Sequence, residues 1–283
     1  MSRLIRIFAV VLAGILIPVA AVNAGTVQIQ LPYVEFGHVY NTDTGLAGGI
    51  PVPWCAPTAT ANSFQFLESH YPAVYGNKLT GGNVINMRNK LATGWLSPGG
   101  VQRGGMIIGV QGASNRSWWE NKVWYIEDYA PGTTVFAGMV ETDPTGWHRG
   151  GDLIWGSPIW QWLWQELLDG EDVEIGIDIG TSIGHALTLT SMSFNDLDGD
   201  LQWDPNETRN IDYLDPNNPS MLFTGAVQQN LVGGRLQFWW NNGGANPNGW
   251  ATIDLAYSES IPEPAALSVL VLGVVAMLRR RLV

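Results

Sequence analysis

The sequence predicts one α+β domain between residues 25 and about 257, on the basis of three patterns. Apolar and polar residues alternate over residues 27–31, which is typical of a strand with one buried face. Apolar residues then recur at helical spacing from Pro57 to His70, and a proline two residues later ends this helix. Strict alternation over residues 173–179 predicts a further strand.

Turn residues and helix caps place the remaining elements. A helix is predicted from Ile159 to Leu168, because Ser157-Pro158 supplies a cap and a first-turn proline. Strands 235–240 and 250–256 flank a turn rich in Asn and Gly, so we expect them to pair. The other predicted elements are a weaker helix at 83–91 and strands at 122–129, 133–140, 186–194 and 211–214.

The composition excludes several classes of protein. Among 283 residues, 25 are acidic and 14 are Lys or Arg, which gives a formal net charge of −11. Nucleic acid is not an expected partner, because phosphate binding needs a basic face. An apolar content of 46% is too high for wholesale disorder, and 34 Gly with 16 Pro exclude a coiled coil. The single cysteine excludes an intrachain disulfide framework and a Cys-rich zinc site.

The first 24 residues are typical of a secretory signal peptide. Two arginines form a basic start, and an apolar stretch follows from Ile7 to Ala20. Val22-Asn23-Ala24 supplies the small residues that signal peptidase needs, so the mature chain is expected to start at Gly25. The alternative is an uncleaved membrane anchor, although the stretch is short for a span of about 20 residues.

The C-terminal segment 258–283 contains three parts in a fixed order. Pro262-Glu263-Pro264 precedes an apolar run from Ala265 to Leu278, and three arginines follow. This order resembles the PEP-CTERM sorting signal of Gram-negative bacteria. The resemblance implies a short transmembrane helix in the inner membrane, cleavage by an exosortase, and release to the cell surface or medium. Proteins with this signal are often associated with exopolysaccharide or biofilm matrix. An ordinary tail anchor is the alternative.

One cysteine and one histidine are candidates for chemistry. Cys55 directly precedes the predicted helix, whose N-terminal N–H groups and partial positive charge stabilise a thiolate nucleophile. His185 opens the predicted strand 186–194. The structural alternatives are a buried cysteine that packs as a small hydrophobe and a histidine without a catalytic role.

The residues around this pair follow a recognisable order. Residues 55–59 read Cys-Ala-Pro-Thr-Ala, and a helix ending in Leu167-Leu168-Asp169-Gly170, an apolar strand and Gly184-His185 come later. This order resembles the C39-like group of papain-like cysteine peptidases, whose nucleophile lies in Cys-Gly-Pro-(Thr/Ala)-Ala. The likeness covers about residues 50–220. It implies a papain-like fold, in which the helix bearing the cysteine packs on an antiparallel sheet, and it implies hydrolysis of peptide bonds.

The same resemblance implies a third residue, an Asp or Asn that orients the imidazole and often lies in Asp-Pro after the next strand. Asp215-Pro216 matches this pattern, so the expected triad is Cys55, His185 and Asp215. Asp212 and Asn195 are the alternatives. Asp215 is also compatible with a residue that only shapes a turn.

One position departs from the family. Papain-like enzymes carry a Gln about six residues before the cysteine as a donor to the oxyanion, and here that residue is Gly49. The backbone N–H of Cys55 can serve as one donor, and Asn41 or a backbone N–H of residues 48–49 is expected to supply the second. Loss of one such donor lowers the rate of a protease by about 10²–10³. An inactive homologue is therefore the alternative.

An acidic loop has the spacing of a calcium site. Oxygen-bearing side chains fall at positions 1, 3, 5, 7, 9 and 12 of the EF-hand and dockerin pattern. The expected ligands are Asp196, Asp198, Asp200, Gln202, Asp204 and Glu207. Position 6, normally Gly, is Leu201. Clustered carboxylates repel one another without a cation, so calcium is expected, and it is expected to fix the strand that leads to Asp215. A solvated acidic turn is the alternative.

Two functions remain open from the sequence. The first is a secreted or surface-sorted cysteine peptidase stabilised by calcium, and the second is an inactive calcium-binding surface or matrix protein on the same fold. Tryptophans are expected either to line a sugar- or peptide-binding groove or to belong to the core. They are Trp118, Trp119, Trp160, Trp162, Trp164, Trp239, Trp240 and Trp250.

Overall fold

A computed structural model describes residues 25–41, 54–106, 118–141, 152–179, 184–229, 233–241 and 249–261. The predicted signal peptide and Gly49 lie outside the described residues, and so does the predicted sorting signal from Pro262 onward. Across the described ranges, no helix is both long and apolar enough to cross a membrane.

The described chain contains both helices and a mainly antiparallel sheet, which confirms the predicted α+β class. The helices are α1 (Cys55–His70), α2 (Val84–Thr93), α3 (Trp118–Tyr129) and α4 (Trp160–Leu168), with a 3-10 turn η1 (Tyr33–Glu35). The strands of the main sheet are β1 (Gly25–Gln30), β4 (Val135–Val140), β5 (Asp152–Trp155), β6 (Asp172–Asp178), β7 (His185–Asp196), β8 (Arg209–Leu214), β9 (Leu222–Gln229), β10 (Leu236–Trp240) and β11 (Gly249–Ser260). A small hairpin joins β2 (Trp95–Leu96) to β3 (Gln102–Arg103).

Six strands close into an antiparallel barrel. Strands β7 to β11 pair in order, and β6 closes the ring because it pairs with β11 on one edge and with β7 on the other. The two longest strands, β7 and β11, have 12 residues each and extend beyond the ring. The extension of β7 pairs with β1, and that of β11 pairs with β4. Strand β5 then pairs in parallel with the outer edge of β4.

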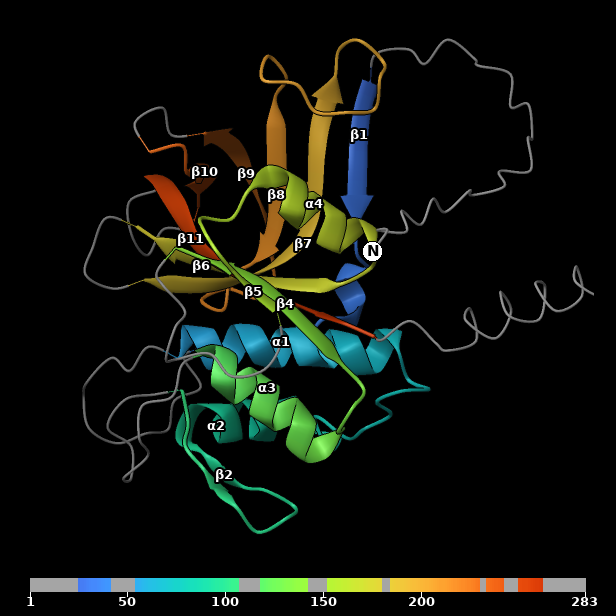
Figure 1. Cartoon of the computed structure of the whole chain (residues 1–283), viewed down its shortest axis with the longest axis vertical. Coiled ribbons are helices and arrows are strands. Elements are labelled where there is room, and N and C mark those ends of the chain that lie inside the picture. The colour runs from blue at the N-terminus through green and yellow to red at the C-terminus, as the bar shows by residue number, and fades with distance from the viewer. Residues whose placement is uncertain are drawn as a thin grey trace, which may run out of the picture.

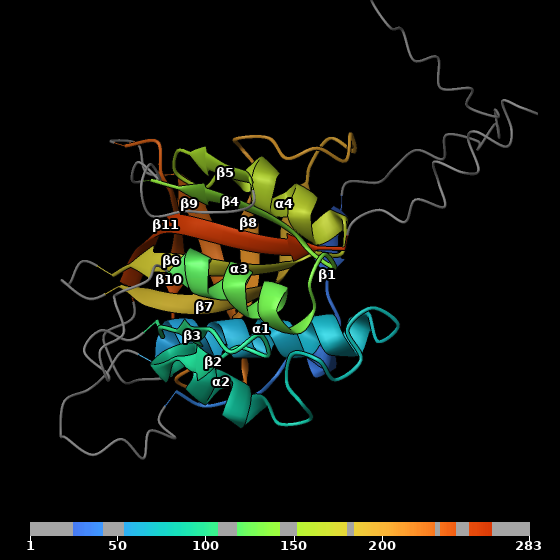
Figure 2. The same ribbon diagram turned by 60° about the horizontal axis from the view of Figure 1, so that its bottom comes forward.

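The helices cover two sides of the barrel strands. Helix α1 packs across β6 and β7, and α2 and α3 pack against α1 (Figure 1). Helix α4 packs on β1, β6 and β7, and Figures 1 and 2 both place it on the other side of these strands from α1. Two fully buried residues of α1 contact the barrel strands: Ala59 O accepts a hydrogen bond from Thr188 Oγ1 of β7 at 3.2 Å, and Ser63 Oγ donates to Asp172 of β6. This packing fixes the start of α1 beside the start of β7.

Several element predictions are wrong or incomplete. Residues 122–129, predicted as a strand, belong to helix α3. The run Val-Trp-Tyr-Ile is rich in the aromatic and β-branched residues of strands, but Trp119, Val123 and Ile126 share the buried face of a helix. Strands β5 and β9 were not predicted, and β11 continues to Ser260, three residues past the predicted domain end.

Candidate active site

Cys55 occupies the first position of α1 and is 8% exposed. Its neighbours are small, because Ala59 one turn later and Ala186 on β7 pack against it. The first amides of a helix have no partner within the helix. Consequently, the thiol lies where backbone N–H groups are free to stabilise negative charge.

His185, the first residue of β7, hydrogen-bonds the Cys55 side chain. Burial raises the pKa of the Cys55 thiol, but the hydrogen bond and charge of His185 and the amides of Ala186 and Ala56 lower it by more. The net pKa therefore lies below the usual value. Burial in turn lowers the pKa of His185, while Asp215 and Cys55 raise it to about 10. Both shifts favour a thiolate paired with an imidazolium.

Asp215 lies directly after β8 and supports the far side of the imidazole. Its Oδ1 is 2.8 Å from His185 Nε2, which leaves Nδ1 as the nitrogen for the thiol. The carboxylate is fully buried and also accepts hydrogen bonds from the Asn217 backbone N–H at 2.8 Å and from Trp240 Nε1 at 3.1 Å. Antiparallel pairing of β7 with β8 sets Thr188 opposite Leu214, and this register brings Asp215 to His185.

The two alternative orienting residues lie elsewhere. Asp212 accepts a hydrogen bond from Thr224 Oγ1 at 2.6 Å. Asn195 is exposed near the other end of β7, opposite Thr26 of β1. The structure thus brings together Cys55, His185 and Asp215, whereas these two residues do not join them.

Two further residues of the site were missed by the sequence analysis. Trp240 donates to Asp215 and its ring centre lies 5.5 Å from that of His185, so it shields the His–Asp hydrogen bond from water. Asn217 Nδ2 lies 3.3 Å from His185 Nε2. The Asp-Pro-Asn sequence was a signal for Asn217, because an Asp side chain often accepts the N–H two residues on. Nothing local marks Trp240, which comes from β10.

A pocket with a volume of about 220 Å³ opens over the pair. Besides Cys55 and His185 it is lined mainly by apolar side chains, among them Trp118, Ile177 and Leu255. Asn41, one predicted oxyanion donor, instead donates its amide to Asn217 Oδ1 at 2.7 Å and supports the loop after Asp215. The other predicted donors, in residues 48–49, lie outside the described residues.

The acidic loop connects β7 to β8, at the ends opposite to His185 and Asp215. Carboxylate oxygens of Asp196, Asp198 and Glu207 lie within 4.8 Å of one another. Asp200 and Asp204 are not part of this group among the described residues, and Gln202 is exposed. A hydrogen bond from the Asp200 backbone lowers the pKa of Asp198, but burial and the neighbouring carboxylates raise it by more.

Leu201 has a φ of 62°, and no other non-glycine residue in the described ranges has a positive φ. It stands at position 6 of the loop, where a calcium loop needs the turn that Gly usually makes. Asp196 holds this turn by accepting the backbone N–H groups of Gly199 at 2.7 Å and Leu201 at 3.1 Å. Leu201 therefore adopts the positive φ that Gly usually supplies at this position.

A second group of acids was not predicted. The carboxylates of Asp172, Glu174 and Glu259 surround the ammonium of Lys122, and all four side chains are fully buried. We call these four residues the buried charge cluster; it joins α3 to β6 and β11. Burial raises the pKa of each carboxyl to about 8, and the neighbouring carboxylates add to this effect while Lys122 opposes it.

The predicted tryptophans divide between core and surface. Trp119, Trp160 and Trp240 are buried, and Trp162 packs against the core. Trp239 and Trp250 are exposed on β10 and β11 and contact each other, with ring centres 5.6 Å apart. Trp118 lines the cysteine pocket, and Trp164 lines a different pocket beside the acidic loop.

Comparison of the chain with models of known protein families and with curated proteins finds no match.

Proposed function

We propose that the protein is a papain-like cysteine peptidase in which Cys55, His185 and Asp215 form the catalytic triad. The proposal rests on one observation: the three side chains form a continuous hydrogen-bonded chain that ends in an open pocket. The cysteine-bearing helix packed on an antiparallel barrel supports the finer, papain-like assignment.

The mechanism follows from these positions. The Cys55 thiolate attacks the carbonyl carbon of a peptide bond, and the backbone N–H of Cys55 stabilises the oxyanion. The C–N bond then breaks as His185 gives its proton to the leaving amine, which leaves a thioester on Cys55. Water, deprotonated by His185, attacks the thioester and releases the acid. Asp215 keeps Nε2 protonated and fixes the ring.

The apolar pocket lining favours substrates with an apolar side chain next to the cleaved bond. Trp118, Ile177 and Leu255 offer no charged group to such a side chain. Asp254 also lines the pocket, and burial together with Glu141 and Asp178 raises its pKa to about 6. Its carboxyl is therefore ionised only above about pH 6, where a basic side chain is the second class that the pocket accepts.

A test needs no known substrate. The protein is incubated with an epoxide probe at mildly acidic pH and with a peptide mixture, and labelled sites and new termini are read by mass spectrometry. We expect labelling at Cys55 and cleavage of peptides, both lost in Cys55→Ala. A folded wild-type protein that neither reacts nor cleaves would contradict the proposal and favour an inactive homologue, which Gly49 supports.

Calcium is proposed as the structural ion of the acidic loop. Asp196, Asp198 and Glu207 offer a hard oxygen set, and the turn at Leu201 has the required backbone conformation. When bound, Ca²⁺ would neutralise carboxylates that otherwise repel one another. Titration calorimetry with Ca²⁺ tests this, with Glu207→Gln expected to weaken binding and Glu127→Gln, on α3, as the matched control.

Export is proposed from the two chain ends. Mass spectrometry of the exported protein should find a start near Gly25 and loss of the arginines at 279–281. That result would support exosortase as the partner of the tail and a cell-surface or extracellular location. An intact C-terminus on the extracellular protein would contradict this route.

A further inference from the structure

Arg209 is a buried cation for which the described residues provide no hydrogen-bond acceptor and no ion-pair partner. It begins β8 and is 6% exposed. Its guanidinium carbon lies 3.7 Å from the ring centre of Trp203 and 5.2 Å from that of Trp160. No hydrogen-bond acceptor or carboxylate pairs with it within the described ranges. A guanidinium has five N–H donors, and buried charges are normally paired, so this side chain is suited to an external acceptor.

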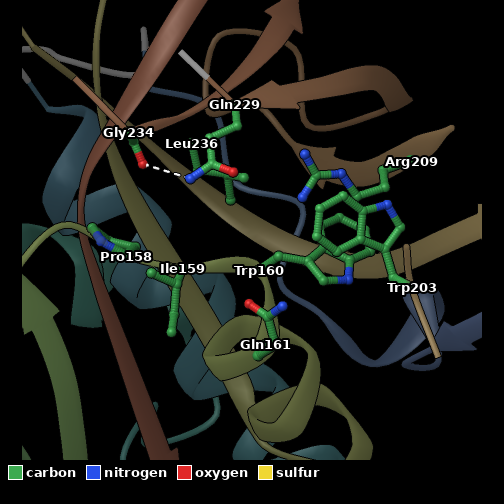
Figure 3. A pocket seen from close by; sticks show the side chains of 9 residues that line it. All are labelled: Pro158, Ile159, Trp160, Gln161, Trp203, Arg209, Gln229, Gly234 and Leu236. Atoms are coloured by element: carbon green, nitrogen blue, oxygen red, sulfur yellow. Dashed lines mark hydrogen bonds between the residues drawn. The ribbon is translucent and has the colours of Figure 1, made fainter. Parts of the chain in front are cut away.

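The guanidinium faces a pocket. Arg209 lines a hollow with a volume of about 200 Å³, whose other walls include Gln229, Trp160 and Gln161. Figure 3 shows the guanidinium end directed toward the middle of this ring of side chains, between Gln229 and Trp160. The amide of Gln229 is held by a bond to Gly234 O at 3.0 Å, while the amide of Gln161 is exposed.

The first turn of α4 forms the opposite wall of the hollow. Ile159, the residue before this helix, provides no side-chain cap, so the first backbone N–H groups of α4 are uncapped. A helix N-terminus favours anions, and here it lies across the hollow from an unpaired guanidinium. Two separate features therefore favour a negatively charged group in one place.

A second hollow continues the first. It has a volume of about 280 Å³, shares Trp160, Gln161 and Trp203 with the first, and adds Trp164 and Gln165. Indole faces pack on the C–H faces of sugar rings, and Gln amides can both donate to and accept from neighbouring hydroxyls. We name the joined hollows the Trp160 groove, lined by Trp160, Gln161, Trp164, Trp203, Arg209 and Gln229.

We propose that the Trp160 groove binds an acidic saccharide, with a uronate carboxylate on Arg209 and sugar rings against Trp164 and Trp203, the two half-buried indoles of the groove. A carboxylate matches the planar fork of the guanidinium in a bidentate pair. The groove lies at the start of β8, whereas Asp215 follows its end, about 20 Å away along the strand. The site is therefore separate from the cysteine pocket and does not depend on catalysis there.

Calorimetric titration of the protein with trigalacturonate tests the proposal, with neutral cellotriose and the acidic peptide triglutamate as comparisons. Trigalacturonate is expected to bind more tightly than either. Arg209→Gln should weaken its binding at least about tenfold, because a charge-assisted bond is lost. Gln161→Ala, on the surface, should weaken it about threefold and provides a second readout if Arg209→Gln unfolds.

Matched controls keep the outcome clear. Arg235→Gln and Gln228→Ala change the same residue types outside the Trp160 groove and should leave trigalacturonate binding unchanged. Absence of trigalacturonate binding overturns the proposal. Equal binding of cellotriose overturns the role of the carboxylate, and equal binding of triglutamate with the same dependence on Gln161 overturns the assignment to a sugar. None of these results bears on labelling of Cys55.

Discussion

Replacing His185 by Ala should raise the pKa of Cys55 and slow its alkylation at acidic pH. Burial of the thiol raises its pKa, and the hydrogen bond and charge of His185 are the main effects that lower it. A hydrogen bond to a charged group contributes about 1.5–3 kcal/mol, and about 1.36 kcal/mol corresponds to one pKa unit. Loss of His185 should therefore raise the thiol pKa by about one to two units or more.

Iodoacetamide reacts with the thiolate, so its rate follows the fraction of thiolate. At pH 6 we expect His185→Ala to react about 10–100-fold more slowly than the wild type. The difference should shrink as the pH rises toward 9. Because the assay measures only Cys55, the one cysteine of the chain, it needs no substrate.

His70→Ala is the matched control, because His70 lies at the other end of α1 and pairs with Glu35 at 2.7 Å. It should leave the alkylation rate unchanged. Melting curves must show that both variants fold. If folded His185→Ala reacts at pH 6 as fast as the wild type, His185 does not activate Cys55 and the reasoning fails.

Four further predictions concern the triad, the buried charge cluster and the acidic loop. Asp215→Asn should lower the rate of peptide hydrolysis by about 10⁴. Asp212→Asn should not, because Asp212 lies on β8 and accepts a hydrogen bond from Thr224 instead of His185. At pH 9, where the carboxyls of the buried charge cluster are ionised, Lys122→Met should lower the free energy of unfolding by about 3–5 kcal/mol in urea titrations, because these carboxylates lose their counter-charge; a loss below about 1 kcal/mol would contradict this. The carboxyls of the buried charge cluster have a folded pKa of about 8, above their unfolded values near 4, so the folded state binds more protons between these pH values. Stability should therefore fall as the pH rises from about 4 to about 8, and a melting temperature that rises over this range would refute the sign. Chelation of Ca²⁺ should lower the melting temperature and slow Cys55 labelling, because Ca²⁺ at a hundredfold excess over its Kd stabilises the folded state by about 2.7 kcal/mol. Unchanged labelling would show that the loop and the triad are not coupled.

Much of the local structure followed from the sequence. The helices at α1, α2 and α4 and the strands at β6, β7 and β10 lie within a few residues of their predicted positions. The wrong strand at 122–129 shows the limit of periodicity, because a short aromatic and β-branched run fits both a strand and a helix face. Strand β9 follows a clear turn signal at residues 215–220, but Thr224, Gly225 and the two glutamines at its end weaken its apolar pattern. Its alternation becomes meaningful only beside β8 and β10.

Local chemistry in the sequence determined three properties: a cysteine at a helix start, a histidine at a strand start and an acidic loop with calcium spacing. These depend on neighbours along the chain, so they can be read from it. The tertiary structure alone decided that β6 closes the barrel against β11, that Trp240 covers the His185–Asp215 bond, and that Arg209 is buried between two indoles with no carboxylate from the described part of the chain beside it. Each of these depends on strand register and packing between segments far apart in sequence, which no local pattern specifies.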